Sequence, residues 1–278
     1  MKKIAAIFDG LKFSDSTLNY AVGIAKEQSA HLTGIFPDDF IYNSFNINKL
    51  ISAGATAEKI AQMEELDKKK RDDSALLFGN ACTNAGLPYS VHRDKSIAIQ
   101  EVLHESIYAD LMVINTTETF QLKEQAPPTD FIRSLLSEVQ CPVLLVPPVH
   151  TPFTKIVLLY DGEPSSVFAI KMCCYLLPAL RNLPVQVISV NDPGAGLQLD
   201  DNKLMREFLT LHFPHAEYKV LNGRVEQTVL EELKAQGPGA LTVLGAYRRG
   251  MVSRWLRESM ADFLMRELSL PLFIAHNK

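Results

Sequence analysis

The stretch KIAAIFDG at residues 3–10 returns as KIVLLYDG at residues 155–162. Each copy is an apolar run that follows a lysine and ends in Asp-Gly. The closing runs repeat as well, because CPVLLVPP at 141–148 is answered by LPLFIAHN at 270–277. Segments that recur in the same order at domain-sized spacing predict a duplicated domain.

A proline-rich segment separates the two copies. PPVHTPFT at 147–154 contains three prolines, which disfavour both a helix and a central strand. We therefore predict a first domain at residues 1–148 and a second domain at residues 153–278.

Both halves alternate short apolar runs with longer segments of helical periodicity. This alternation predicts an α/β fold in which a parallel sheet is covered by helices on both faces. Ligands in such sheets bind at the carboxyl ends of the strands, where Asp9, Asp161 and Gly245 stand. The strands are expected near residues 3–8, 30–36, 89–92, 110–115, 142–146, 155–160, 184–190, 216–221, 240–245 and 271–275.

The composition is that of an ordinary globular protein. Hydrophobic residues make up 47% and charged residues 22% of the 278 positions, and the net charge is −4. Without a basic excess or a membrane-spanning apolar run, neither nucleic acid nor a membrane is expected as a partner. The apolar run before Asp9 is too short for the core of a signal peptide, so a cytoplasmic location is expected. No metal-ligand cluster and no nucleophile paired with a base is visible, so no metal-binding or catalytic residue is assigned.

The loop GAYRRGMVSRWLRES at 245–259 joins an apolar strand to a helical segment. Glycine lets backbone N–H groups approach an anion, and the start of a helix adds a favourable dipole. Ser259 has a second explanation, since SMAD at 259–262 has the pattern of a helix capping box. The Asp-Gly pairs have one too, because this dipeptide turns well after a strand. A phosphate site and ordinary turns both remain open.

The paired openings and closing strands resemble the universal stress protein family in its tandem form, over nearly the whole chain. The resemblance implies a five-stranded parallel sheet in each half and dimers made by pairing the last strands. It also implies ATP binding in members with a loop of the form G-x2-G-x9-G-S/T after the fourth strand. Here the two closing strands are expected to pair with each other as an internal pseudo-dimer, and a homodimer of whole chains is a further option.

In the second half the loop keeps the spacing of the motif, but two of the four motif residues are replaced. Gly245 matches the first glycine and Ser259 the terminal serine, whereas Arg248 and Glu258 stand at the other glycine positions. Gly250 is a candidate replacement hinge. The nucleoside contact of the family falls on Asp161, with a neighbour near Val190. The residues predicted to bind a nucleotide, with ATP as the candidate cofactor, are Asp161, Val190, Gly245, Arg248, Gly250 and Ser259.

The matching loop of the first half, NTTETFQLKEQAPPTD at 115–130, contains no glycine. Asn115 replaces the first glycine, while Asp130 replaces the terminal serine and is expected to cap the next helix. Glu118 and Glu124 add negative charge near the position of the anion. We therefore predict that the first half does not bind ATP.

Two functions fit this pattern. One is a regulatory or stress-response module without a catalytic apparatus. The other is a protein that binds ATP in its second half alone and hydrolyses it slowly or not at all. Thermal stabilisation by ATP distinguishes the two, because a ligand stabilises the state that it binds.

The first half carries an insertion after its second strand. Asp9 lies 80 residues before Tyr89, whereas Asp161 lies 57 residues before Tyr218. The inserted stretch DDFIYNSFNINKLISAGA at 38–55 is too apolar for an idle linker. Its apolar side chains are Phe40, Tyr42, Phe45, Ile47, Leu50 and Ile51.

We predict that some of these side chains cover the cleft beside Asp9. The alternatives are a longer following helix, and an exposed docking surface for a partner or a second copy of the chain. Further along, the mixed charges of EELDKKKRDD at 64–73 predict a solvated helix face.

Overall fold

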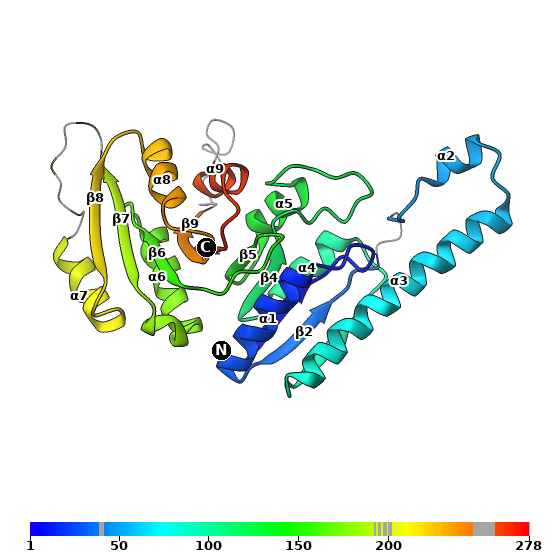
Figure 1. Ribbon diagram of the computed structural model, residues 1–278, viewed down its shortest axis with the longest axis horizontal. Coiled ribbons are helices and arrows are strands. Elements are labelled where there is room, and N and C mark those ends of the chain that lie inside the picture. Colours follow the sequence, from blue (N-terminus) through cyan, green and yellow to red (C-terminus); the bar gives the residue numbers. More distant parts are fainter. Residues whose placement is uncertain are drawn as a thin grey trace.

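The computed structural model describes residues 1–38, 42–191, 193, 196, 199, 202–246 and 259–277. In this part of the chain ten strands form one sheet in the order β3-β2-β1-β4-β5-β10-β9-β6-β7-β8, with helices packed around it (Figure 1). No helix within these ranges is long and apolar enough to cross a lipid bilayer. The α/β class predicted from the sequence is confirmed.

The first half of the sheet has the strand order 3-2-1-4-5. Each of its strands overlaps one of the predicted apolar runs. The elements are β1 (Lys3–Ile7), α1 (Asp15–Gln28), β2 (His31–Ile35), α2 (Ile47–Ser52), α3 (Ala57–Asn84), β3 (Tyr89–His92), α4 (Ala98–Ser106), β4 (Leu111–Asn115), α5 (Asp130–Glu138) and β5 (Val143–Val146).

The second half repeats this order, since β6 to β10 take the places of β1 to β5. Here too every strand overlaps a predicted run. The elements are β6 (Lys155–Leu159), α6 (Pro164–Leu176), a short 3-10 helix (Pro178–Asn182), β7 (Val185–Asn191), α7 (Asn202–His212), β8 (Glu217–Asn222), α8 (Val225–Lys234), β9 (Ala240–Gly245), α9 (Met260–Glu267) and β10 (Leu272–Ala275).

The two halves meet at β5 and β10, which pair antiparallel although the strands within each half are parallel. Leu144 stands opposite Phe273 and Leu145 opposite Leu272, and all four side chains are buried. Each closing strand thereby covers an apolar edge of the other, which is otherwise a site for unwanted pairing. The predicted pseudo-dimer within one chain is confirmed.

The antiparallel junction also decides where ligands of the two halves can bind. Because β5 and β10 run in opposite directions, all strands of the first half point one way and all strands of the second half point the other way. The carboxyl ends of the two sets of strands therefore lie on opposite sides of the molecule. Asp9 and Asp161 therefore stand at opposite ends of the strands and cannot belong to one site.

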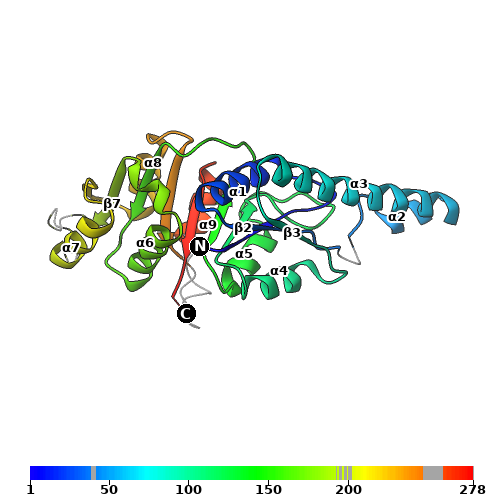
Figure 2. The ribbon, with the colours of Figure 1, turned by 90° about the horizontal axis from the view of Figure 1, so that it is seen from below.

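The inner strands of the sheet are buried on both faces, whereas the edge strands β3 and β8 are partly exposed. Along β1, Ile4, Ala6 and Phe8 pack into one core cluster, while Ala5 and Ile7 pack into another. In the first half α1 and α3 lie on one side of the sheet and α4 and α5 on the other (Figure 2). A strand buried on both faces has to be apolar throughout, which explains the continuous runs in the sequence.

The insertion of the first half forms α2 and lengthens α3 to 28 residues, against 11 residues in α7. Together α2 and the start of α3 project from the body of the first half as an arm (Figure 1). Only the later part of α3 enters the core, where Phe78 and Cys82 are buried. The alternative that segment 38–55 only extends the following helix is wrong, because α3 begins at Ala57, after the segment, and the helix inside the segment is the separate α2.

Candidate ligand clefts at the two edges of the sheet

The cleft of the first half is covered by a side chain of the insertion. Asp9 follows β1 and is 1% exposed. Its Oδ2 accepts a hydrogen bond of 2.7 Å from the Tyr42 hydroxyl, and its Oδ1 accepts one of 2.8 Å from the Leu11 N–H. The predicted lid over Asp9 is therefore confirmed for Tyr42, whereas Phe40 lies outside the described residues.

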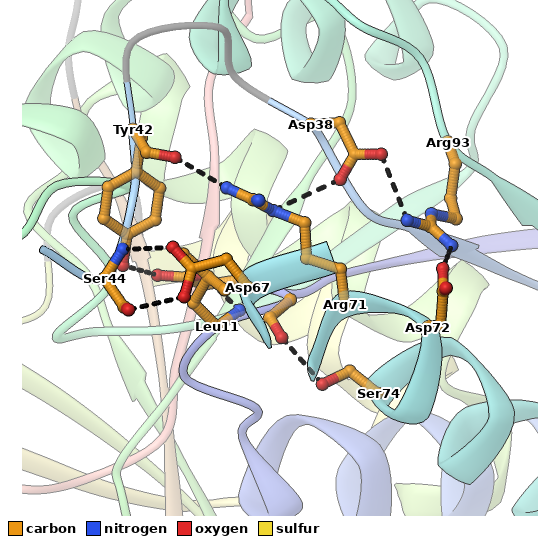
Figure 3. A network of polar contacts seen from close by, with 11 residues as sticks. Leu11, Asp38, Tyr42, Ser44, Asp67, Arg71, Asp72, Ser74 and Arg93 are labelled. Carbon is orange, nitrogen blue, oxygen red and sulfur yellow. Dashed lines mark hydrogen bonds and ion pairs between the residues drawn. The ribbon is translucent and has the colours of Figure 1, made fainter. Parts of the chain in front are cut away.

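Charged side chains of α3 hold this lid in place (Figure 3). The Asp67 carboxylate accepts hydrogen bonds from the backbone N–H and the hydroxyl of Ser44. Arg71 donates to the carbonyl oxygen of Tyr42 at 2.6 Å and pairs with the Asp38 carboxylate at 3.3 Å. The prediction of a solvated helix face is wrong for these positions, because Asp67 is 2% exposed and its carboxylate faces the insertion rather than water.

The close passage of α3 also explains the glycine after Asp9. A Cβ atom at Gly10 would lie 2.9 Å from Cγ of Arg71, and the Gly10 carbonyl oxygen accepts a 2.8 Å hydrogen bond from the Ser74 hydroxyl. Glycine is required here by packing against α3, the helix whose side chains hold the lid in place.

A second buried acid stands next to Asp9. Glu118 lies in the loop after β4 and is 5% exposed. Burial and the nearby Asp9 carboxylate raise the pKa of Glu118 to about 8, although the Thr119 N–H, the Lys12 ammonium and the Asp9 N–H partly oppose this. Burial likewise raises the pKa of Asp9, against the lowering effect of the Tyr42 hydroxyl. This cleft holds two protonatable carboxyl groups and is poorly suited to an anion.

The helix after this loop is capped by a residue other than the predicted one. Thr129 is the N-cap of α5, and its hydroxyl accepts a 3.2 Å hydrogen bond from the Ile132 N–H. Asp130 is the first helical residue and is exposed. Thr129 follows Asn115 by 14 residues, just as Ser259 follows Gly245. The prediction that Asp130 replaces the terminal serine was wrong by one residue, because the spacing counted from Asn115 leads to Thr129.

The cleft of the second half differs in its exposure. Asp161 follows β6, and its Oδ1 accepts a 3.0 Å hydrogen bond from the Glu163 N–H, the same local turn as at Asp9. The predicted turn-forming role of both aspartates is therefore confirmed. Asp161, unlike Asp9, is exposed to solvent.

Three of the predicted nucleotide-binding residues are brought to one edge of the sheet. Asp161, Val190 and Gly245 stand at the carboxyl ends of β6, β7 and β9, which are neighbours in the sheet. Val190 is half-buried against the core. Arg248 and Gly250 lie outside the described residues.

Gly245 and Ser259 have structural roles of their own. A Cβ atom at Gly245 would lie 2.5 Å from the backbone carbonyl group of Ser165, so the close approach of α6 requires glycine. Ser259 is the N-cap of α9, and its hydroxyl accepts a 3.1 Å hydrogen bond from the Asp262 N–H. The capping interpretation of Ser259 is confirmed, and neither residue needs a ligand to explain it.

Comparison with known proteins identifies the fold. No family profile and no curated protein matches the sequence. The structure of a universal stress protein from Archaeoglobus fulgidus DSM 4304 superposes on this chain with a TM-score of 0.69 and 13% sequence identity. The match covers 99% of this chain and 98% of the other. The chain has the tandem universal stress protein fold.

Two Pseudomonas aeruginosa structures share this tandem arrangement. A protein of unknown function from strain PAO1 has a TM-score of 0.60, and a candidate universal stress protein from strain UCBPP-PA14 has one of 0.58. Each is 14% identical, and each match covers 99% of this chain and 92% of the other. The structural similarity establishes the tandem universal stress protein fold. Because the sequence identity is low, the chemistry of the two clefts follows only from the residues of this chain.

Proposed function

We propose that the protein is a regulatory, stress-response module of the universal stress protein type, whose second half binds a nucleotide while its first half does not. The observation that carries this proposal is the contrast between Asp9, buried under Tyr42, and Asp161, exposed at the opposite edge of the sheet. A cytoplasmic location belongs to the same proposal.

The first half is unsuited to a nucleotide for two reasons. The Tyr42 hydroxyl already occupies the Asp9 oxygen to which a sugar hydroxyl would donate. A phosphate would also lie beside the buried acids Asp9 and Glu118, whose pKa values are both raised. If either acid ionised, it would repel a phosphate charge 4 Å away by about 4 kcal/mol at an effective dielectric constant near 20. Binding would have to displace the lid and keep both acids protonated.

The second half offers complementary groups at an accessible edge. The exposed Asp161 carboxylate can accept hydrogen bonds from sugar hydroxyls. The half-buried Val190 provides an apolar contact for a base at the end of the adjacent strand. The amino terminus of α9, capped by Ser259, provides a dipole that favours a phosphate.

Titration calorimetry of the full chain with Mg-ATP tests this proposal. We expect one site, and we expect Asp161→Ala to weaken binding about tenfold, because the lost hydrogen bonds contribute about 1–1.5 kcal/mol. Asp94→Ala, which removes an exposed acid in the first half, should leave the affinity unchanged. Asp161 is preferred to Gly245 for this test because any side chain at Gly245 would collide with α6.

Release of inorganic phosphate, measured in the same samples, tests the competing possibility of slow hydrolysis. A regulatory module should release no phosphate above the buffer blank. Two equivalent sites, or an Asp161→Ala variant that binds as tightly as the native chain, would contradict the proposal. If no heat of binding were measured at millimolar ATP, the nucleotide-binding part of the proposal would be wrong.

A further inference from the structure

A cavity of about 680 Å³ lies between the insertion and the body of the first half. One wall is formed by Tyr42, Phe45 and Ile47 of the insertion, and the other by residues of α4 and of the loop after β4, among them Ile97 and Phe120. Tyr42 therefore contributes to both sites. Its hydroxyl donates a hydrogen bond to Asp9, and the residue also lines this cavity.

The lining of the cavity is uncharged. Aromatic rings come from Tyr42, Phe45, Phe120 and Phe131, and the other described side chains of the wall are aliphatic, amide or hydroxyl groups. The volume falls within the range of about 300–1,000 Å³ that is typical of small-molecule sites. Eight of the 14 described lining side chains are apolar, and the other six carry hydrogen-bonding groups: Tyr42, Asn43, Asn46, Asn48, Thr119 and Gln121.

The backbone of the inner wall adopts a conformation that packing alone rarely requires. Phe120 has a φ of 49°, in the left-handed region that non-glycine residues usually avoid. Its buried ring packs against Phe131 at a centroid distance of 4.6 Å. The adjacent turn is closed by the Thr119 hydroxyl, which accepts a hydrogen bond from the Gln121 N–H. Backbone strain of this kind is concentrated at ligand sites, where it fixes a side chain in position.

We propose that this cavity binds an uncharged small molecule that contains a ring and carries hydrogen-bonding substituents. Aromatic side chains favour a ring by stacking, and the amide and hydroxyl groups of the wall can orient one or two polar substituents. The described lining side chains are all uncharged. The Lys12 ammonium lies beside the wall, where it donates a 2.8 Å hydrogen bond to the Gln121 carbonyl oxygen and stands over the Tyr42 ring, and the acids Asp9 and Glu118 balance its charge. An uncharged ligand therefore fits this wall better than an anion. The proposal concerns the first half and is independent of nucleotide binding in the second.

The test uses N-phenyl-1-naphthylamine, an uncharged aromatic dye that becomes fluorescent in apolar surroundings. Titration into the full chain should give a saturable rise in fluorescence. Ile97 lines the cavity mouth and is 48% exposed. Ile97→Asp should weaken dye binding about tenfold or more, because the carboxylate would lose water on contact with the dye. Ile97 is the N-cap of α4, a position where aspartate is favourable, so the variant should fold.

Ile107→Asp is the matched control, since Ile107 is the C-cap at the other end of α4, is 57% exposed and is not part of the cavity wall. It should bind the dye as the native chain does. A fluorescence rise that fails to saturate, or that both variants reduce equally, would overturn the proposal. Displacement of the dye by ATP would overturn the ligand class, because it would place an anion in this cavity.

Leu122→Asp provides a second probe of the same wall, from the loop after β4 instead of α4. Leu122 is 44% exposed and lines the cavity. We expect Leu122→Asp to weaken dye binding as well. If this variant bound the dye fully while Ile97→Asp bound it weakly, the dye would lie elsewhere along α4 and the assignment to this cavity would be wrong.

Discussion

Replacing Phe273 by alanine should lower the free energy of unfolding by about 3–5 kcal/mol, the usual cost of truncating a buried phenylalanine. Phe273 is fully buried on β10, opposite Leu144 of β5, and belongs to a core cluster with members from both halves. Because the junction joins the two halves into one sheet, the loss should appear in both. Urea unfolding followed by circular dichroism measures the change, and hydrogen exchange at β1 and β6 locates it.

Leu211→Ala is the control for this prediction, because Leu211 is 75% exposed on α7. Its effect should stay within about 0.5 kcal/mol. If unfolding occurred in two separate steps, with Phe273→Ala affecting protection in β6 and leaving β1 unchanged, the halves would be independent domains and the account of the junction would be wrong.

The buried acids should make the protein less stable as the pH rises from about 5 to 8. The pKa of Glu118 is raised from 4.5 in an ordinary glutamate to about 8 in the folded chain. The folded state therefore retains a proton that the unfolded state releases, and the stability present below pH 4.5 is lost as the pH approaches 8. At about 1.4 kcal/mol per pKa unit the loss amounts to a few kcal/mol. Urea unfolding at pH 5, 6.5 and 8 measures it.

Glu118→Gln should flatten this dependence and make the variant more stable than the native chain at pH 8. Glutamine has nearly the shape of protonated glutamate and carries no charge to bury. Glu124→Gln, an exposed change in the same loop, should leave the pH profile as it is. The explanation would fail if the native slope persisted in Glu118→Gln.

The sheet could be predicted from the sequence because its inner strands are buried on both faces. Such strands are unbroken apolar runs, and their two copies in the same order revealed the duplication. The pairing of β5 with β10 was expected from the family resemblance, and it also covers two apolar edges. These inferences depend on patterns that repeat locally along the chain.

The contents of the first cleft could be predicted only in part. The length and apolar character of the insertion indicated a lid, and Tyr42 provides it. Asp67 and Arg71 were taken for solvated charges, because helical spacing identifies a polar face and not what packs against it. The cavity between residues 42–48 and 119–122 joins segments far apart in the sequence, and no periodicity connects them.

The predicted nucleotide residues show a related difficulty. Gly245 and Ser259 were selected because they match a phosphate loop, and the structure gives each a role in packing or capping. A motif that also fits the structural needs of the strand and helix around it cannot by itself distinguish a working site from its remnant.

Photolabelling with 8-azido-ATP tests most directly whether the two clefts differ as proposed. The full chain would be irradiated with the Mg complex, digested, and its labelled peptides identified by mass spectrometry, with excess ATP as the competitor. We predict that competed label is confined to peptides of the second half, near the ends of β6, β7 and β9. Competed label on peptides that contain Asp9, Tyr42 or Glu118 would contradict the account, as would the absence of any competed label at saturating nucleotide.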